Sequence, residues 1–212
     1  MTFPFEFLLF GATLLGVAIF HRHTLQVALS GLVLIAAWKL GFGEFHGAPG
    51  LVGLLHHLGG EWVLLTNLFA LLVGFAVLSR HFELSGIPEL MPGFLPNDWR
   101  GGLLLLAIVF VLSGFLDNIA AAIIGATVAG SVYRHRMHIG YLAAIVAASN
   151  AGGAGSVVGD TTTTMMWLDG VPPLHVLHAY LAAIAAFLVF AIPASRLQQK
   201  FSPIIRDPSR TV

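Results

Sequence analysis

Residues 149–164 read Ser-Asn-Ala-Gly-Gly-Ala-Gly-Ser-Val-Val-Gly-Asp-Thr-Thr-Thr-Thr and interrupt a long apolar stretch. Each glycine costs a helix about 1 kcal/mol relative to alanine, so four glycines this close together disfavour a continuous helix. The hydroxyl and amide side chains around them add oxygen atoms that could replace lost backbone partners. We therefore predict one span, residues 139–168, whose backbone is unwound somewhere between Ser149 and Thr161.

The composition of the whole chain indicates a membrane protein. Of its 212 residues 57% are hydrophobic and 9% are charged, whereas soluble domains carry about 25% charged residues. Lys plus Arg and Asp plus Glu balance at 10 each, so no nucleic-acid partner is expected, and there is no cysteine. The sequence contains no nucleophile–base pair, phosphate loop or dinucleotide fingerprint. We expect neither an enzyme, nor a cofactor, nor a resident metal.

Five stretches are candidates for membrane-spanning helices, because about 20 apolar residues are needed to cross a bilayer. Four are simple apolar runs and the fifth is the interrupted segment above. A loop is expected at residues 42–61, and the proline-rich residues 81–98 are expected to lie at the membrane surface without forming a long helix. The four simple spans are residues 3–20, 25–42, 62–78 and 174–194.

The apolar block at residues 101–133 is too long for one ordinary span and short for two. Cytoplasmic loops collect Lys and Arg. If this block enters the membrane and returns, Arg100 and Arg136 lie on the same side, and nine of the ten basic residues are cytoplasmic, the exception being Lys39. We therefore predict a re-entrant helical hairpin with Asp117 and Asn118 at its tip.

The expected fold is an all-α, polytopic protein of the inner (plasma) membrane with five transmembrane helices and one re-entrant hairpin. Residues 1–200 would form the membrane part, and residues 201–212 a polar cytoplasmic tail.

Two aspartates break the membrane pattern. An ionised side chain at membrane depth costs roughly 2.5–3.5 kcal/mol on insertion scales, so it normally marks a site or a pathway. Asp117 would lie at the hairpin tip and Asp160 in the unwound span. Hard cations prefer oxygen ligands, and a carboxylate beside them can take up a proton when the cation leaves. The candidate ion-binding residues are Asp117, Asn118, Ser149, Asn150, Asp160, Thr161, Thr162 and Thr163.

Simpler interpretations exist for both aspartate segments. Glycine, alanine, serine and threonine also mediate close helix packing in membranes, so the glycines could serve packing alone. Asp117 and Asn118 could lie in a loop exposed to water. His175 and His178 share a helix face, but no carboxylate lies near them in the sequence, so we predict no metal site there.

Three segments, in this order, resemble the ion transporter superfamily that includes arsenite, citrate and dicarboxylate permeases. They are Asn67-Leu-Phe-Ala-Leu-Leu-Val-Gly-Phe-Ala76, Ser113-Gly-Phe-Leu-Asp-Asn-Ile119 and the block from Ser149 to Trp167. The run Gly159-Asp-Thr-Thr162 is most similar to NhaD-type sodium/proton antiporters. Carboxylate-transporting branches typically place Ser-Asn-Thr at the hairpin tip, and Asp117-Asn118 departs from that pattern.

The resemblance implies a carrier that exchanges Na⁺ for H⁺ across the bilayer. Family members contain two inverted repeats, and this chain matches the N-terminal repeat only, so a second repeat half or an oligomer is the expected partner. Two alternatives stay open. The chain could be an organic anion or citrate-type permease of the same superfamily, or it could be a half-length subunit that does not itself transport.

Overall fold

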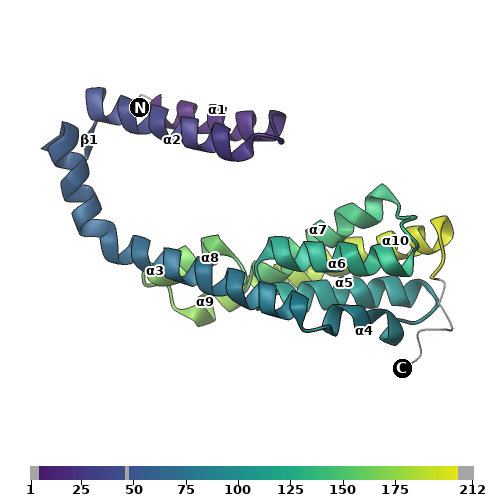
Figure 1. Ribbon diagram of the computed structural model, residues 1–212. Coiled ribbons are helices and arrows are strands. Elements are labelled where there is room, and N and C mark those ends of the chain that lie inside the picture. Colours follow the sequence, from purple (N-terminus) through teal and green to yellow (C-terminus); the bar gives the residue numbers. More distant parts are fainter. Residues whose placement is uncertain (1–4, 46–47, 205–212) are drawn as a thin grey trace. The chain divides into compact units, whose positions relative to one another are not determined.

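The structure, a computed structural model, describes residues 5–45 and 48–204, with the backbone alone at residues 44, 45 and 48. The predicted tail at 201–212 therefore lies mostly outside the described residues. Figure 1 shows the elements in chain order. They are α1 (Phe5–Ile19), α2 (Thr24–Phe42), β1 (Glu44–Phe45), β2 (Ala48–Pro49), α3 (Gly50–Leu84), α4 (Ile87–Phe94), α5 (Trp99–Ser113), α6 (Asn118–Val132), α7 (Ile139–Gly153), α8 (Thr161–Leu168), α9 (Pro173–Leu177) and α10 (Ala179–Phe201).

The predicted all-α class is confirmed. In the described part of the chain, regular structure is helical apart from the two-residue strands β1 and β2, which pair antiparallel. Three helical segments are long and apolar enough to cross a membrane, namely α2, α3 and the stretch Pro173–Phe201 formed by α9 and α10. The other apolar helices, α1, α5, α6 and α7, have 15 residues each.

The helix α3 is longer than the span predicted from the sequence. It contains 35 residues and starts at Gly50, so the loop expected at residues 42–61 is helical from residue 50 onward. Gly59 and Gly60 do not end the helix, because strong helix formers surround them and no proline lies between Gly50 and Leu84. Pro88, Pro92 and Pro96 do restrict the segment after α3, and only the short helix α4 forms there.

The chain divides into two compact units, residues 1–66 and 67–212. In unit 1, α1 packs against α2. A Cβ atom at Gly31 would lie 2.3 Å from the Thr13 side chain, so glycine permits the two helices to approach. Few side chains are buried here, and Leu15 and Leu32 are among many exposed apolar residues. A helix that is apolar all round suits a lipid environment.

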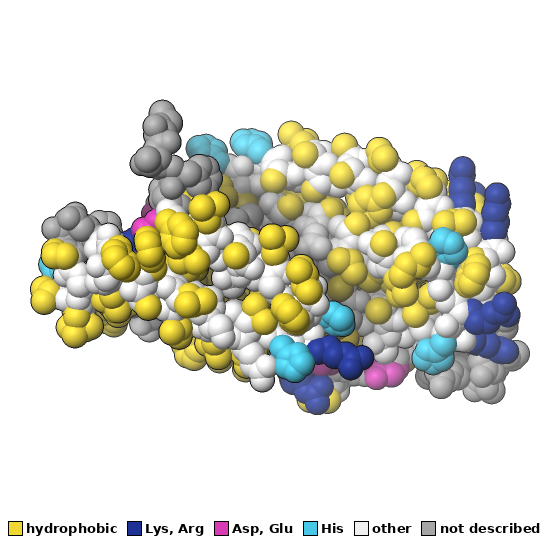
Figure 2. Space-filling view, turned by 90° about the horizontal axis from the view of Figure 1, so that it is seen from above, with side chains coloured by type: hydrophobic (Ala, Val, Ile, Leu, Met, Phe, Trp, Pro, Cys, Tyr) yellow, Lys and Arg dark blue, Asp and Glu magenta, His cyan; other side chains and the backbone are white. Residues whose placement is uncertain are grey.

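Unit 2 contains the hydrophobic core. Helices α5, α6, α7 and α10 lie side by side (Figure 1), and α4 packs on α6. Leu105, Val109 and Ile145 are buried between them. The hydroxyl of Tyr141 donates to the carbonyl of Gly102 at 2.7 Å, which ties α7 to the start of α5. Outside this core, hydrophobic side chains cover much of the molecular surface (Figure 2), as expected for a membrane protein.

The side chain of Gln198 connects several segments at one end of unit 2. It is fully buried. Its Oε1 accepts from the amide of His138 at 2.7 Å, and its Nε2 donates to the carbonyls of Arg136 at 3.0 Å and Ser202 at 3.3 Å. The loop between α6 and α7 is therefore fixed to the C-terminal turns of α10.

Candidate functional site

Two interrupted helical segments meet within unit 2. The first interruption separates α5 from α6 at residues 114–117, and the second separates α7 from α8 at residues 154–160. The second lies in the interval where the sequence predicts unwinding. Hydrogen bonds join the two: Ser113 Oγ donates to the carbonyl of Ser149 at 2.5 Å, and Ser156 Oγ donates to the carbonyl of Gly114 at 2.6 Å. We call residues 113–118 together with residues 149–164 the junction.

Glycines allow the two backbones to touch at the junction. A Cβ atom would lie 1.9 Å from the Phe110 carbonyl oxygen at Gly152, and 1.9 Å from the Ser113 carbonyl oxygen at Gly159. Neither separation is possible for a real Cβ atom. Close packing and the interruption of the helix therefore occur together, because one contact lies at the end of α7 and the other lies within the non-helical residues.

The carboxylate of Asp160 lies inside the junction. Its Oδ1 accepts from the amide of Thr162 at 2.7 Å and so caps α8. Its Oδ2 accepts from Asn118 Nδ2 at 3.0 Å. The Asn118 amide also approaches Asn150 Oδ1 at 3.4 Å. Three of the predicted site residues, from α6, α7 and the loop before α8, are thus in direct contact.

The carboxylate of Asp117 has a different set of partners. Its Oδ1 accepts from the amides of Ile119 at 2.8 Å and Ala120 at 2.9 Å, which caps α6. Its Oδ2 faces the hydroxyl of the buried Ser79 on α3, at 3.3 Å. Among the hydrogen bonds of the described residues, Asp117 and Asp160 share no partner. The two carboxylates therefore play separate structural roles at the junction.

The hydroxyl oxygen of Ser113 lies close to two other oxygen atoms. This fully buried hydroxyl lies 2.5 Å from the Ser149 carbonyl oxygen and 2.7 Å from Asn118 Oδ1. A hydroxyl has one proton to donate, so it can satisfy only one of these two acceptors at a time. The Ser149 hydroxyl does not donate to either of these oxygens, because it donates to the carbonyl of Val146 within its own helix at 2.9 Å.

The four threonines separate into two pairs. Thr163 and Thr164 are buried. Thr163 Oγ1 lies within hydrogen-bond distance of the carbonyls of Ser156 and Asp160, and Thr164 Oγ1 lies 2.7 Å from the carbonyl of Val157 and 2.9 Å from that of Asp160. These hydroxyls therefore close the loop before α8. Thr161 and Thr162 are exposed in the first turn of α8, and the hydrogen bonds place neither hydroxyl in the cluster around Ser113.

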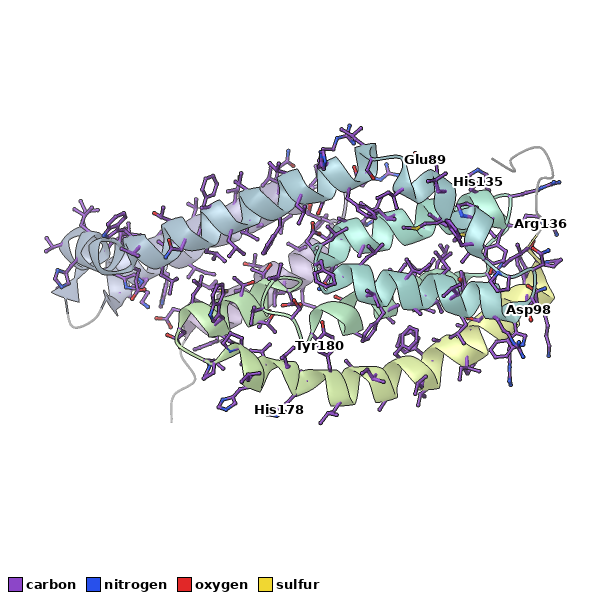
Figure 3. All side chains as sticks on the ribbon, turned by 90° about the horizontal axis from the view of Figure 1, so that it is seen from below. Glu89, Asp98, His135, Arg136, His178 and Tyr180 are labelled. Carbon is purple, nitrogen blue, oxygen red and sulfur yellow. The ribbon has the colours of Figure 1, made fainter. Side chains whose placement is uncertain are left out.

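Sequence reasoning missed three contributors, Ser79, Ser113 and Tyr180, as site residues. Tyr180 reaches the junction from α10 (Figure 3), and its hydroxyl donates to the carbonyl of Gly152 at 3.0 Å. Its ring covers Gly155, where a Cβ atom would lie 2.4 Å away. The sequence feature that could have identified Tyr180 is that it is the one hydroxyl-bearing residue in the predicted span 174–194.

An open, largely apolar cavity of about 490 Å³ lies beside the junction. Its lining combines junction residues with apolar side chains of α5, α9 and α10 and includes Phe110, Gly114, Gly155, Ser156, Leu177 and Tyr180. Among the described residues, no group of three or more His, Cys, Asp or Glu side chains is placed to hold a metal ion.

Comparison with protein-family models, with curated proteins and with solved structures finds no match to this chain, so its resemblance to the transporter superfamily rests on the sequence motifs alone.

Proposed function

We propose that this chain forms one half of a membrane carrier that exchanges Na⁺ or Li⁺ for H⁺, with the cation bound at the junction. In this proposal the junction is the ion site and Asp160 is its titrating group. Asp117 stabilises the start of α6 and contributes negative charge nearby.

The observation that carries this proposal is the cluster of oxygen atoms around Ser113. The Ser149 carbonyl oxygen and Asn118 Oδ1 lie 2.5 Å and 2.7 Å from Ser113 Oγ. A small monovalent cation attracts all three oxygens at once. An anion would be repelled by the same atoms.

Asp160 provides the link to protons. Asn118 joins the oxygen cluster to this carboxylate, because its Oδ1 faces Ser113 at 2.7 Å and its Nδ2 faces Asp160 Oδ2 at 3.0 Å. A cation beside Asn118 favours the ionised carboxylate, and a proton on Asp160 disfavours the cation. Competition between the two ions for one site is the minimal requirement for exchange.

The capping pattern makes the anion-permease alternative less favourable. Such a permease would hold its substrate at the N-termini of short helices, where free amides and the helix dipole attract negative charge. Here the first amides of α6 donate to Asp117, and an amide in the first turn of α8 donates to Asp160. Both helix ends therefore already hold a carboxylate of the protein itself.

The helix lengths support a re-entrant arrangement of α5 and α6. Fifteen residues each correspond to roughly 22 Å at 1.5 Å per residue, which is shorter than the ~30 Å hydrocarbon core. A pair of such helices, joined by a short turn, can enter and leave on one side with Asp117 and Asn118 near the middle. The carrier site would then be completed by a second repeat half or by another subunit, as in carriers built from inverted repeats.

The proposal is tested first by ion binding to the junction residues of this chain. The purified chain in detergent should bind ²²Na⁺, and H⁺ should displace it. Asp160→Asn and Ser113→Ala should each weaken binding by at least about tenfold, equivalent to about 1.4 kcal/mol. The matched control is Asp169→Asn, because Asp169 is exposed at the other end of α8.

Vesicle assays then test exchange itself. Na⁺ added to vesicles that contain the chain with its completing half should drive proton movement, and Asp160→Asn should abolish it. Sodium binding that is unchanged in both Asp160→Asn and Ser113→Ala would overturn the proposed site. Sodium binding without any exchange would instead favour a half-length subunit that does not transport.

A further inference from the structure

Five basic side chains gather at one end of unit 2. They come from the first turn of α5, the loop between α6 and α7, and the last turns of α10. Contacts link these three segments: Gln198 bonds to the carbonyl of Arg136, Gln199 Nε2 donates to the carbonyl of Asn97 at 3.3 Å, and the Arg196 guanidinium lies 4.8 Å from the centre of the Trp99 ring. We call this set the basic collar. Its members are Arg100, Arg134, Arg136, Arg196 and Lys200.

The charge of the basic collar is only partly offset within the described part of the chain. The ion pair found there joins Arg100 Nε to Asp98 Oδ2 at 3.8 Å, and the Arg100 side chain is 73% exposed. The labelled acidic residues near this end are Asp98 and Glu89 (Figure 3). Arg134 and Arg136 are exposed and form no salt bridge among the described residues. An anionic partner would therefore find exposed guanidinium groups here.

The loop that carries two of these arginines has an unusual backbone. Arg134 and His135 have φ angles of 50° and 60°, in the left-handed region that side chains other than glycine rarely adopt. Hydrogen bonds from the His135 amide to the Gly130 carbonyl at 2.7 Å and from the Arg136 amide to the Tyr133 carbonyl at 2.9 Å hold this conformation. Because Gln198 also fixes the Arg136 carbonyl, the loop presents its arginines from a defined backbone.

Apolar groups beside the basic collar indicate which kind of anion fits. The short helix α4 packs on α6, and it exposes Leu90 and Phe94, the latter by 76%, while Met91 is buried. Trp99 lies under Arg196, and tryptophan and arginine are typical of the membrane–water interface. A free phosphate ion would gain nothing from exposed Leu90 and Phe94. A phospholipid places acyl chains and a phosphate beside each other, and so matches both features.

We propose that the basic collar binds the headgroup of an anionic phospholipid, with Arg134 and Arg136 at the phosphate and α4 against the acyl chains. Arginine suits this role because its guanidinium can form two parallel hydrogen bonds to phosphate oxygens. The interaction does not depend on the proposed cation exchange, since the collar shares no residue with the junction.

The test titrates the full chain, purified in a zwitterionic detergent, with dioleoylphosphatidylglycerol. Dioleoylphosphatidylcholine and inorganic phosphate are titrated in parallel. Phosphatidylglycerol should bind most tightly. Each basic residue near an anionic lipid surface contributes about 1 kcal/mol, so the double variant Arg134→Gln/Arg136→Gln should bind it roughly 30-fold more weakly. The charge-retaining variant Arg134→Lys/Arg136→Lys should keep most of the affinity.

The matched control is Arg80→Gln, because Arg80 is already paired with Glu83 at 3.0 Å. Its removal should change phosphatidylglycerol binding by no more than about twofold. Equal binding of phosphatidylglycerol and phosphatidylcholine would overturn the proposal. So would binding of inorganic phosphate as tight as that of the lipid, because the collar would then be a site for a soluble anion. Unchanged lipid affinity in the double glutamine variant would also overturn it.

Discussion

Replacing Gly152 by alanine should separate the two interrupted helices. A Cβ atom there would lie 1.9 Å from the Phe110 carbonyl oxygen, 2.7 Å from its carbon and 2.9 Å from its Cα. Ordinary contact begins near 3.4 Å, so the two backbones must move apart by about 1.5 Å. Both partners are backbone, and therefore no side-chain rotation can relieve the clash.

The size of the effect depends on the contacts that cross the same interface. Overpacking costs typically 1–3 kcal/mol. The shift also stretches the hydrogen bonds from Tyr180 to the Gly152 carbonyl and from Ser113 to the Ser149 carbonyl, each contributing about 1 kcal/mol. Alanine recovers about 1 kcal/mol through its higher helix propensity. We expect a net loss of roughly 2–4 kcal/mol, or roughly 5–15 °C in Tm.

Thermal unfolding of the purified protein in detergent, followed by circular dichroism, measures this loss. Gly74→Ala is the matched control, because Gly74 lies in helix α3 and a Cβ atom there would meet no other atom within 4 Å. That variant should be unchanged or stabilised by up to about 1 kcal/mol. If Gly152→Ala and Gly74→Ala melt at the same temperature, the close contact between α5 and α7 is wrong.

Two further substitutions test the junction. Gly153→Ala would place a Cβ atom 2.2 Å from Asn118 Oδ1, so it should displace that amide and weaken ²²Na⁺ binding by at least about tenfold. Because the Asn118 side chain can move, the loss of stability should be smaller than that of Gly152→Ala. Unaltered sodium binding would contradict this role of Asn118. Tyr180→Phe removes the 3.0 Å hydrogen bond to the Gly152 carbonyl but keeps the ring over Gly155. In the same unfolding experiment it should lower the free energy of unfolding by about 1 kcal/mol. A wild-type Tm would show that the hydrogen bond contributes nothing to stability.

The helical class and the interruption before Asp160 could be predicted from the sequence because both depend on local composition. The glycines near Gly153 lower helix propensity, and the hydroxyl side chains after them offer other partners to the backbone. The length of α3 was harder to predict, since Gly59 and Gly60 resemble a boundary. Their low propensity is outweighed by the apolar helix formers on both sides.

The partners within the junction could not be predicted from local patterns. Ser113 and Ser149 are 36 positions apart, and Asn118 and Asp160 are 42 apart, so their contacts depend on how α5, α6 and α7 pack. Asp117 illustrates the limit most clearly. Its position suggested an ion ligand, whereas its hydrogen bonds go to the first amides of α6 and to Ser79 on α3. Nothing in the residues next to Asp117 identifies Ser79.

The buried Gln198 has a consequence for how the protein is made. It satisfies the amide of His138, 60 positions earlier in the chain, and the carbonyl of Arg136, 62 positions earlier. Synthesis proceeds from the N-terminus, so α5, α6 and α7 leave the ribosome before their final partner exists. Until the end of α10 emerges, those two backbone groups must bond to water. The loop between α6 and α7 can therefore form these two hydrogen bonds only after the last turns of α10 have been synthesised.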